Sequence, residues 1–135
     1  MSVMLDLLLG APGESRDSIV QTVDLMKRAD PDRVGVSLGV RVYPGTALEG
    51  EFVGRKDADG LVGGGGPFDP LFFLEPEIEQ GVFEWLHAWI GDDRRFLFYD
   101  PSRPEQNYNY NDNQRLVDAI RQGHRGAYWD ILRKL

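Results

Sequence analysis

The first 43 residues alternate between apolar runs and one amphipathic stretch, and this pattern limits the fold more than any other feature. The apolar run 4–9 predicts a strand that ends in a turn rich in glycine and proline. A helix is predicted over 16–29, with Ser15 as its N-cap and Pro31 just past its end. A second strand is predicted over 33–43. Strand, helix and strand at this spacing form a βαβ unit, so the two strands should be parallel.

The remaining residues fall into two stretches of different composition. Residues 51–75 include four consecutive glycines at 63–66, which predicts an irregular connection. Residues 76–135 are predicted to be mostly helical, with helices from 76 to 90, 112 to 122 and 125 to 135 and a short strand at 96–99. We therefore expect an α/β protein in which residues 1–50 form two parallel βα units of a partial barrel. A helical extension follows the connection.

Side-chain alternation along the second predicted strand separates an apolar face from a more polar one. The apolar face should pack on helices and carries Val34, Val36, Leu38, Val40 and Val42. The other face carries Gly35, Ser37, Gly39, Arg41 and Tyr43. This order of small and then polar groups favours a barrel wall with room for a ligand. As alternatives, the glycines accept bulky neighbours and Arg41 ends the strand in solvent or pairs with Asp6 of the first strand.

The segment Gly10-Ala11-Pro12-Gly13-Glu14-Ser15 lies between the first strand and the helix. In parallel α/β folds, ligands bind at the carboxyl ends of strands, where helix N-termini offer free N–H groups. The segment lacks the Lys-Ser/Thr pair of a phosphate-binding P-loop. It is therefore either a ligand-binding turn or an ordinary tight βα turn.

Composition excludes several classes of function. The net charge is −7 and the 15 basic residues are scattered, so we do not expect nucleic acid as a partner. The chain has no cysteine, which excludes disulfides, thiolate metal ligands and a cysteine-held cluster. His87 and His124 are too far apart in sequence to suggest a metal site, and we place His87 on a helix surface. We expect no membrane span and no signal peptide, hence a cytoplasmic protein.

Two short motifs carry a resemblance to a known family. Residues 10–15 resemble the turn after the fifth strand of radical S-adenosylmethionine (radical SAM) barrels, and Val40-Arg41-Val42-Tyr43-Pro44-Gly45-Thr46 resembles the sixth strand with its closing turn. Segments 71–74 and 107–113 resemble the extension found in relatives described as Fe–S oxidoreductases, some with a cobalamin-binding domain. The resemblance implies the C-terminal part of such a protein.

The resemblance also assigns roles to individual residues. The nucleoside part of S-adenosylmethionine would be held by Gly10, Pro12, Gly13 and Glu14, with the backbone of Val42 and Tyr43 near the adenine. Asp6, Ser37 and Arg41 would face the barrel lumen, where cofactor or substrate binds. The family's 4Fe-4S cluster sits on a CxxxCxxC loop that this chain lacks. We therefore expect no catalytic residue, no metal and no stably held cofactor on this chain alone.

The missing N-terminal part of the barrel is the partner that the resemblance implies. Exposed strand edges should otherwise pair with a second copy, or be covered by residues 70–75 or 96–99. The segment 107–113 is predicted to be a turn in which Asn111 or Asp112 caps the next helix, in preference to base stacking by Tyr108 and Tyr110. Two other functions remain open: a non-catalytic nucleotide-binding, small-molecule-binding or interaction module that uses the Gly10 turn, and a purely structural domain.

Overall fold

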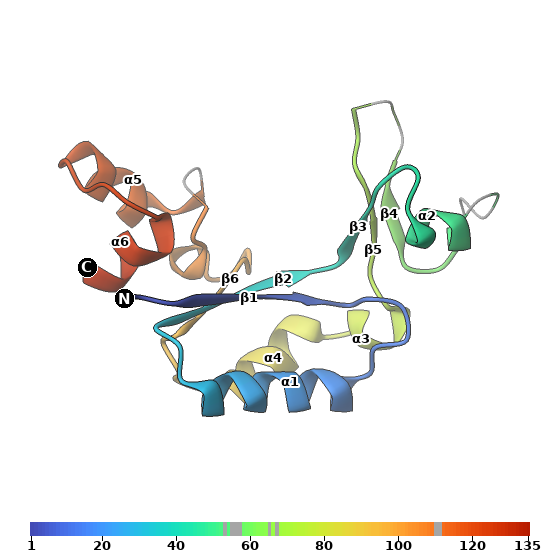
Figure 1. The fold of residues 1–135 in the computed structure, drawn as a ribbon, viewed down its shortest axis with the longest axis horizontal. Coiled ribbons are helices and arrows are strands. Elements are labelled where there is room, and N and C mark those ends of the chain that lie inside the picture. The colour runs from blue at the N-terminus through green and yellow to red at the C-terminus, as the bar shows by residue number, and fades with distance from the viewer. Residues whose placement is uncertain (53, 55–57, 65, 67, 110–111) are drawn as a thin grey trace.

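The computed structural model describes residues 1–52, 54, 58–64, 66, 68–109 and 112–135 (Figure 1). Three strands form a parallel sheet in the order β1-β2-β6, and three others form an antiparallel sheet in the order β3-β5-β4. The elements along the chain are β1 (Met4–Leu9), α1 (Arg16–Ala29), β2 (Arg33–Leu38), β3 (Val40–Val42), α2 (Ala47–Phe52), β4 (Leu61–Gly63), β5 (Leu71–Phe73), α3 (Pro76–Glu79), α4 (Val82–Ile90), β6 (Phe96–Phe98), the 3-10 turn η1 (Pro104–Gln106), α5 (Gln114–Arg121) and α6 (Tyr128–Lys134).

The βαβ unit predicted at the N-terminus is confirmed. β1 and β2 are parallel along their whole length, and Asp6 lies opposite Gly35. α1 begins at Ser15, whose side chain accepts the Ser18 N–H while the Ser18 hydroxyl accepts the Ser15 N–H. The helix ends at Asp30 in the left-handed conformation. Both ends of the connecting helix are therefore fixed by local hydrogen bonds.

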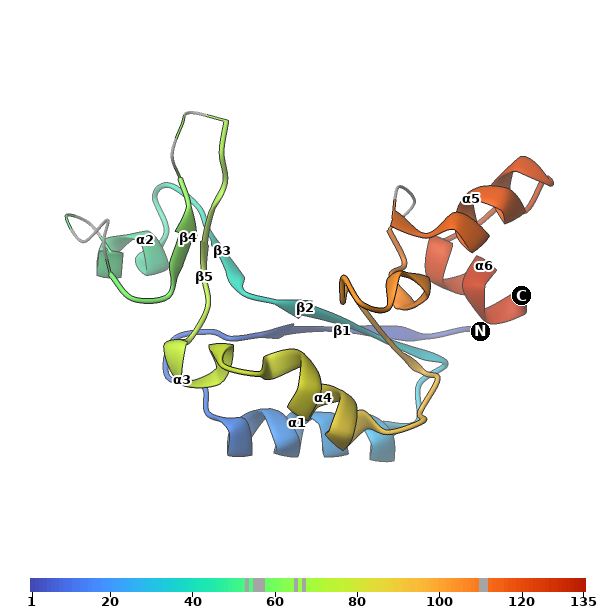
Figure 2. The ribbon, with the colours of Figure 1, turned by 180° about the vertical axis from the view of Figure 1, so that it is seen from behind.

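The helices α1 and α4 cover one face of the parallel sheet and lie below it in Figure 1, with the same arrangement from behind in Figure 2. The main core lies between them and is formed by buried residues of β1, β2, β6, α1, α3 and α4: Leu9, Ile19, Val23, Val34, Val36, Ile78, Val82, Leu86, Ile90, Phe96 and Phe98. Trp89, predicted to face this core, is 44% exposed, and Ile90 takes the buried position. Gly81 divides the predicted helix 76–90 into α3 and α4.

The prediction of one strand over 33–43 is wrong. The chain turns at Gly39, which has φ of +81°, and the two halves join different sheets. A side chain at Gly39 would lie 3.3 Å from the Phe73 carbonyl oxygen, so this crossing of β3 and β5 needs glycine. Residues 51–75, predicted to be irregular, contain the strands β4 and β5 that pair antiparallel with each other.

The C-terminal helices form a separate small lobe. α5 and α6 pack on each other through Leu116, Ala119 and Ile131. Tyr128 and Leu135, predicted on the apolar faces, are 44% and 48% exposed. Asn113 caps α5 through its side chain, one residue later than the predicted Asp112; the other predicted cap, Asn111, and Tyr110 lie outside the described residues.

The outer edge of β2 is covered by β6, one of the two coverings predicted for it. No strand of the described residues pairs with the outer edge of β1. The parallel sheet is thus open, and the predicted barrel stays a prediction. Within the described part of the chain, no helix has the length and apolar character needed to cross a membrane.

Candidate functional site

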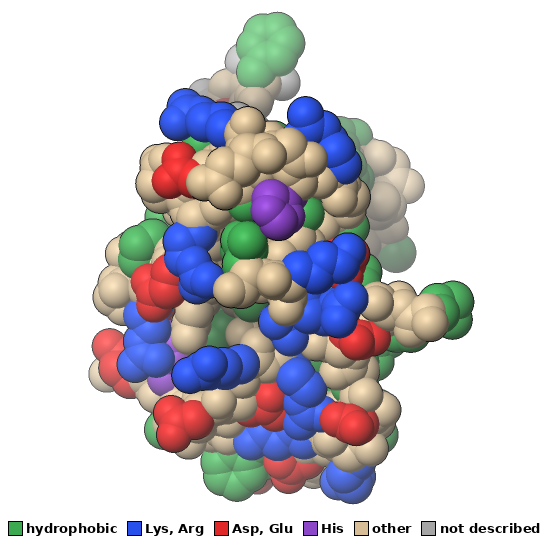
Figure 3. All heavy atoms as spheres, turned by 90° about the vertical axis from the view of Figure 1, so that its left-hand side faces the viewer, with side chains coloured by type: hydrophobic (Ala, Val, Ile, Leu, Met, Phe, Trp, Pro, Cys, Tyr) green, Lys and Arg blue, Asp and Glu red, His purple; other side chains and the backbone are tan. Residues whose placement is uncertain are grey.

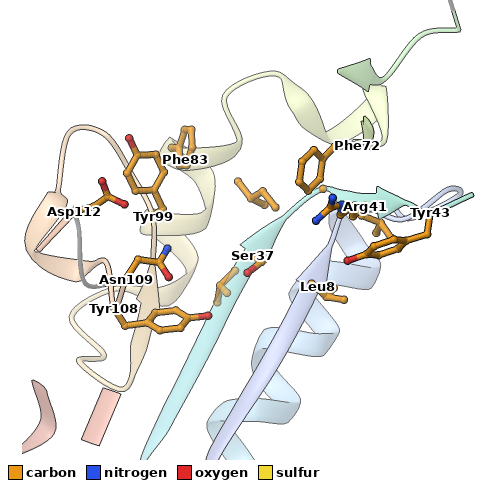
Figure 4. A pocket seen from close by; sticks show the side chains of 14 residues that line it. Leu8, Ser37, Arg41, Tyr43, Phe72, Phe83, Tyr99, Tyr108, Asn109 and Asp112 are labelled. Atoms are coloured by element: carbon orange, nitrogen blue, oxygen red, sulfur yellow. The ribbon is translucent and has the colours of Figure 1, made fainter. Parts of the chain in front are cut away.

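The face of the parallel sheet opposite α1 and α4, here called the open face, bears a cavity of about 840 Å³ (Figure 4). This volume is in the range of small-molecule sites. The cavity surrounds the carboxyl end of β2, where ligands collect in parallel α/β folds. Its lining comes from β1, β2, β3, β5, α4 and the segment after β6: Leu8, Val36, Ser37, Leu38, Gly39, Val40, Arg41, Tyr43, Phe72, Phe83, Tyr99, Tyr108, Asn109 and Asp112.

Three of the nine residues predicted for a site line this cavity: Ser37, Arg41 and Tyr43. The Arg41 guanidinium lies 4.8 Å from the centre of the Tyr43 ring. The alternative pairing of Arg41 with Asp6 is not found, because Gly39 redirects the chain and places the two residues in different sheets. Among the described residues no carboxylate pairs with Arg41, so its charge remains available to a ligand.

Asp6 lies beside the cavity and is linked to it through Tyr108. The Tyr108 hydroxyl donates to Asp6 Oδ1 at 3.5 Å, and it also hydrogen-bonds the Ser37 side chain. Burial raises the pKa of Tyr108, and the negative charge of Asp6 raises it further, while the Ser37 hydrogen bond opposes this. A Cβ at Gly35 would overlap Asp6 Oδ1 and Met4 Cε, so glycine is what lets these groups meet.

Aromatic side chains form the walls of the cavity, and the sequence analysis missed most of them. Phe72 comes from β5, Phe83 from α4, and Tyr99 and Tyr108 from the segment after β6 (Figure 4). Tyr108 was assigned to a turn. Sequence patterns marked segments 71–74 and 107–113 only as parts of the extension. Several apolar groups here are open to solvent, with Leu8 64% and Tyr99 51% exposed, which is typical of a surface that binds something.

The Gly10 turn does not line this cavity. Glu14 folds back so that its carboxylate accepts the N–H groups of Gly10 and Ala11, and Gly13 N–H donates to Glu75 Oε2 at 2.7 Å. The backbone N–H of Glu75 donates to the Gly10 carbonyl at 2.9 Å. The turn thus holds the segment before α3 by hydrogen bonds in both directions. The predicted cofactor role of Gly10, Pro12, Gly13 and Glu14 stays a prediction.

Val42 is buried and lies outside the main cavity. It lines a second depression of about 450 Å³ together with Tyr43 and residues of the β4–β5 region. Tyr43 is therefore the one residue of the predicted adenine pair that reaches the main cavity, and the contact with adenine stays a prediction.

The segment that supplies Tyr99 and Tyr108 is fastened from the helix side. His87 Nε2 lies 2.6 Å from Asp100 Oδ2, and Arg103 Nη1 lies 3.1 Å from His87 Nδ1. The N–H and hydroxyl of Ser102 both donate to Asp100 Oδ1. Burial by itself would raise the pKa of Asp100, but the hydrogen bonds from Ser102 and His87 outweigh it and lower that pKa. His87, placed on a helix surface by the sequence analysis, is largely buried by this contact.

The residues present do not fit an iron–sulfur cluster. The chain has no cysteine, and in the described residues no three His, Asp or Glu side chains gather as metal ligands. They do fit an organic ligand with an acidic group and a flat ring, because Arg41 supplies a cation and the cavity supplies aromatic faces.

No protein-family model matches the chain, and no curated protein matches it. The fold matches two structures of the radical S-adenosylmethionine methyltransferase TsrM from Kitasatospora setae. The structure solved with tryptophan substrate and a SAM analog (aza-SAM) has a TM-score of 0.82 and 22% identity, over 98% of this chain and 32% of the other. The structure with cobalamin and a [4Fe-4S] cluster has a TM-score of 0.73 and 19% identity, over 99% of this chain and 30% of the other.

The chain thus spans about a third of the length of the solved chains that it matches. The likeness is one of fold: this chain has the fold of part of a radical SAM methyltransferase. Those enzymes are methyltransferases, whereas the sequence resemblance pointed to Fe–S oxidoreductases.

Proposed function

We propose that the chain forms part of the wall of the cofactor and substrate cavity in a cobalamin-associated radical SAM enzyme. It would contribute the later strands of the barrel and the C-terminal extension, while the cluster is held elsewhere. The observation that carries the proposal is the cavity at the carboxyl end of β2, in a chain with the fold of part of TsrM. The reaction of the whole protein would be a radical SAM methyl transfer.

The open face supports this role in a second way. Leu8, Tyr43 and Tyr99 are exposed around the cavity, and the outer edge of β1 has no strand partner in the described residues. Additional strands pairing with β1 would extend the parallel sheet and enclose the open face. Ser37, Arg41 and Tyr108 would then lie inside the enclosure.

The test is to map S-adenosylmethionine and ATP on the isolated chain by amide chemical shifts. Chemical shifts also detect weak binding, so S-adenosylmethionine should shift the amides of Ser37, Arg41 and Tyr108 even though the chain alone does not hold it stably. Arg41→Ala should weaken that binding. Arg28→Ala, an exposed arginine on α1, is the matched control. Shifts by ATP at Gly10 to Glu14 alone would favour the nucleotide-binding alternative. A chain that responds to neither ligand would be a structural domain, and the proposal would fail.

A further inference from the structure

A further pocket lies at the opposite end of the sheet from the cavity, near the start of β2 and both chain ends. It measures about 490 Å³ and is lined by Arg33, Arg94, Phe96, Leu97, Glu105, Gln106, Arg115, Leu132, Arg133 and Leu135. The sequence scatters its four arginines over a hundred positions, and the fold gathers them from β2, the loop before β6, α5 and α6. We call it the arginine pocket.

The charge of this pocket is opposite to that of the chain. Its side chains include four arginines and one glutamate, which leaves a formal excess of three positive charges, whereas the whole chain carries −7. Figure 3 shows this side of the molecule, with Lys and Arg side chains grouped over it and acidic side chains between them. Asp130, which pairs with Arg133, and Asp32 and Asp93, which lie near Arg33, offset part of this charge, and a bound anion would complement the rest.

Two of these four arginines have no hydrogen-bond or ion-pair partner within the described part of the chain. They are Arg94 and Arg115, and both are exposed. Arg95, the neighbour of Arg94, is by contrast saturated by Asp93 and Asp30. The two adjacent arginines therefore have different environments. Arg95 stabilises the loop through its carboxylate partners, whereas the guanidinium of Arg94 is exposed and available to a ligand.

Arg33 gives a second and independent indication. Its Nε is buried without a hydrogen-bond partner in the described residues, while its Nη1 donates to the Asp32 carbonyl oxygen at 2.9 Å. Burial lowers the pKa of Arg33 and the positive charge of Arg133 lowers it further, while the nearby carboxylates of Asp32 and Asp93 oppose this shift only in part. Arg133 is itself paired with Asp130 at 2.8 Å.

We propose that the arginine pocket binds a small molecule carrying a phosphate or pyrophosphate group. Guanidinium groups offer paired N–H donors that match phosphate oxygens, and several arginines around one pocket suit an anion with more than one negative charge. The apolar side of the pocket, with Phe96, Leu97 and Leu132, leaves room for an organic part of the ligand. The site is separate from the cavity on the open face.

The test is isothermal titration of the isolated chain with pyrophosphate at low salt. Arg94→Gln combined with Arg115→Gln should weaken binding at least about tenfold, because charge-assisted hydrogen bonds are lost. The control is Arg28→Gln with Arg121→Gln, which changes the net charge equally on helix surfaces outside the pocket. It should leave binding within about twofold, since separated surface charges are screened. Circular dichroism would check that both variants fold.

Three outcomes would overturn the proposal. Equal weakening in both double variants would mean that pyrophosphate responds only to net charge. The absence of pyrophosphate binding would remove the site. Tighter binding of a glutamate-rich peptide than of pyrophosphate would identify the pocket as a docking site for an acidic protein segment. Because none of these variants touches Ser37, Arg41 or Tyr108, failure here leaves the proposed function untouched.

Discussion

The two faces of the β1-β2-β6 sheet are built from the same strands and have opposite roles. On the helix side, Leu9, Val34 and Val36 are almost fully buried beneath α1 and α4. On the open face, their neighbours Leu8 and Ser37 are exposed around a cavity. Strand alternation makes this difference possible, since adjacent residues point to opposite sides. The side chains on one face of the sheet therefore stabilise the fold, and those on the other face are accessible to a ligand.

Adjacent leucines on β1 give the sharpest test of this difference. Leu9→Ala should lower the free energy of unfolding by ~2–5 kcal/mol, because Leu9 is 1% exposed and its loss leaves a cavity in the core. Leu8→Ala removes the same atoms from the open face and should change the free energy of unfolding by less than about 0.5 kcal/mol. Urea unfolding of both variants measures the two values.

Equal losses in the two leucine variants would contradict the comparison. They would mean that the open face is packed in solution, for instance against a second copy of the chain. The oligomeric state over a range of concentrations would then decide, because a homodimer unfolds with concentration-dependent stability. An association through the exposed edge of β1 remains a prediction until this is measured.

The cavity wall after β6 can be loosened without touching the core. Asp100→Asn should cost roughly 1–3 kcal/mol at neutral pH, because it weakens the hydrogen bonds from Ser102 and His87 to a buried carboxylate. Amide exchange should speed up from Tyr99 to Asn109 while β1 and α1 stay protected. Equal exchange changes in both regions would show that the wall and the core unfold together.

The same carboxylate gives a pH dependence with a definite sign. The folded pKa of Asp100 is below its usual value, so its stabilising contribution is present above about pH 4 and is lost as pH falls through the lowered pKa. Asp100→Asn should therefore flatten the fall in stability on acidification. Asp92→Asn, at an exposed carboxylate of the preceding turn, is the control.

Gly35 on the open face tests the effect of a steric clash on stability, rather than the loss of buried apolar area. Gly35→Ala should cost about 1 kcal/mol or slightly more, since the new Cβ meets the ends of the Asp6, Met4 and Tyr108 side chains, which can move aside. Gly13→Ala is the matched comparison: a Cβ there meets nothing within 4 Å, but φ is +79°. Its cost, also about 1 kcal/mol, would come from the backbone alone.

The two glycine variants should lose similar amounts of stability, but they should differ in their affinity for S-adenosylmethionine. If the Gly10 turn holds the nucleoside of S-adenosylmethionine, Gly13→Ala in the whole protein weakens that binding. If the cavity holds it, Gly35→Ala has the larger effect, because it displaces Asp6 and with it the partner of Tyr108. Titration of S-adenosylmethionine into both variants distinguishes the turn from the cavity.

Individual helices and strands were predicted well from the sequence, whereas the contacts between distant segments were predicted poorly. The strand 4–9, the helix 16–29 with its Ser15 cap and the strand 96–99 were predicted from short-range patterns, and the structure confirms them, with the last strand one residue shorter. The division of 33–43 at Gly39 could not be predicted, because it depends on Phe73 approaching from 34 residues away along the chain. Ser37, Arg41 and Tyr43, which alternation grouped on one face, line the same cavity, and their role in binding stays a prediction.

The aromatic lining and the arginine pocket were missed for the same reason. Tyr99 and Tyr108 reach the cavity through the position of the loop that His87 and Asp100 fasten, which no periodicity reveals. Scattered arginines likewise carry no signal until the fold gathers them. The Gly10 turn differs in another way: its motif suggested free N–H groups, and in the structure those of Gly10, Ala11 and Gly13 donate to Glu14 and Glu75. Its cofactor role stays a prediction.

The smallest expected effect concerns the hydroxyl of Tyr108, and it reports most directly on the open face. Tyr108→Phe should change stability by less than about 1 kcal/mol, because one long hydrogen bond to Asp6 and one to Ser37 are lost. Its signature is in the titration of the five tyrosines followed by ultraviolet absorbance. Burial and the charge of Asp6 raise the pKa of Tyr108, so one phenol should ionise later than the unperturbed value of about 10.

The raised pKa also fixes the sign of the alkaline stability change. The contribution of neutral Tyr108 is complete below about pH 10 and is lost as pH rises through the higher folded pKa. Tyr108→Phe should remove the late phenol, and Asp6→Asn should shift it towards lower pH. Tyr99→Phe removes an exposed phenol from the same cavity and should leave the late one in place. Were no phenol to ionise late in the parent chain, the Tyr108 hydroxyl would lie in solvent, and the cavity would lack the wall that joins β1 and β2 to the segment after β6.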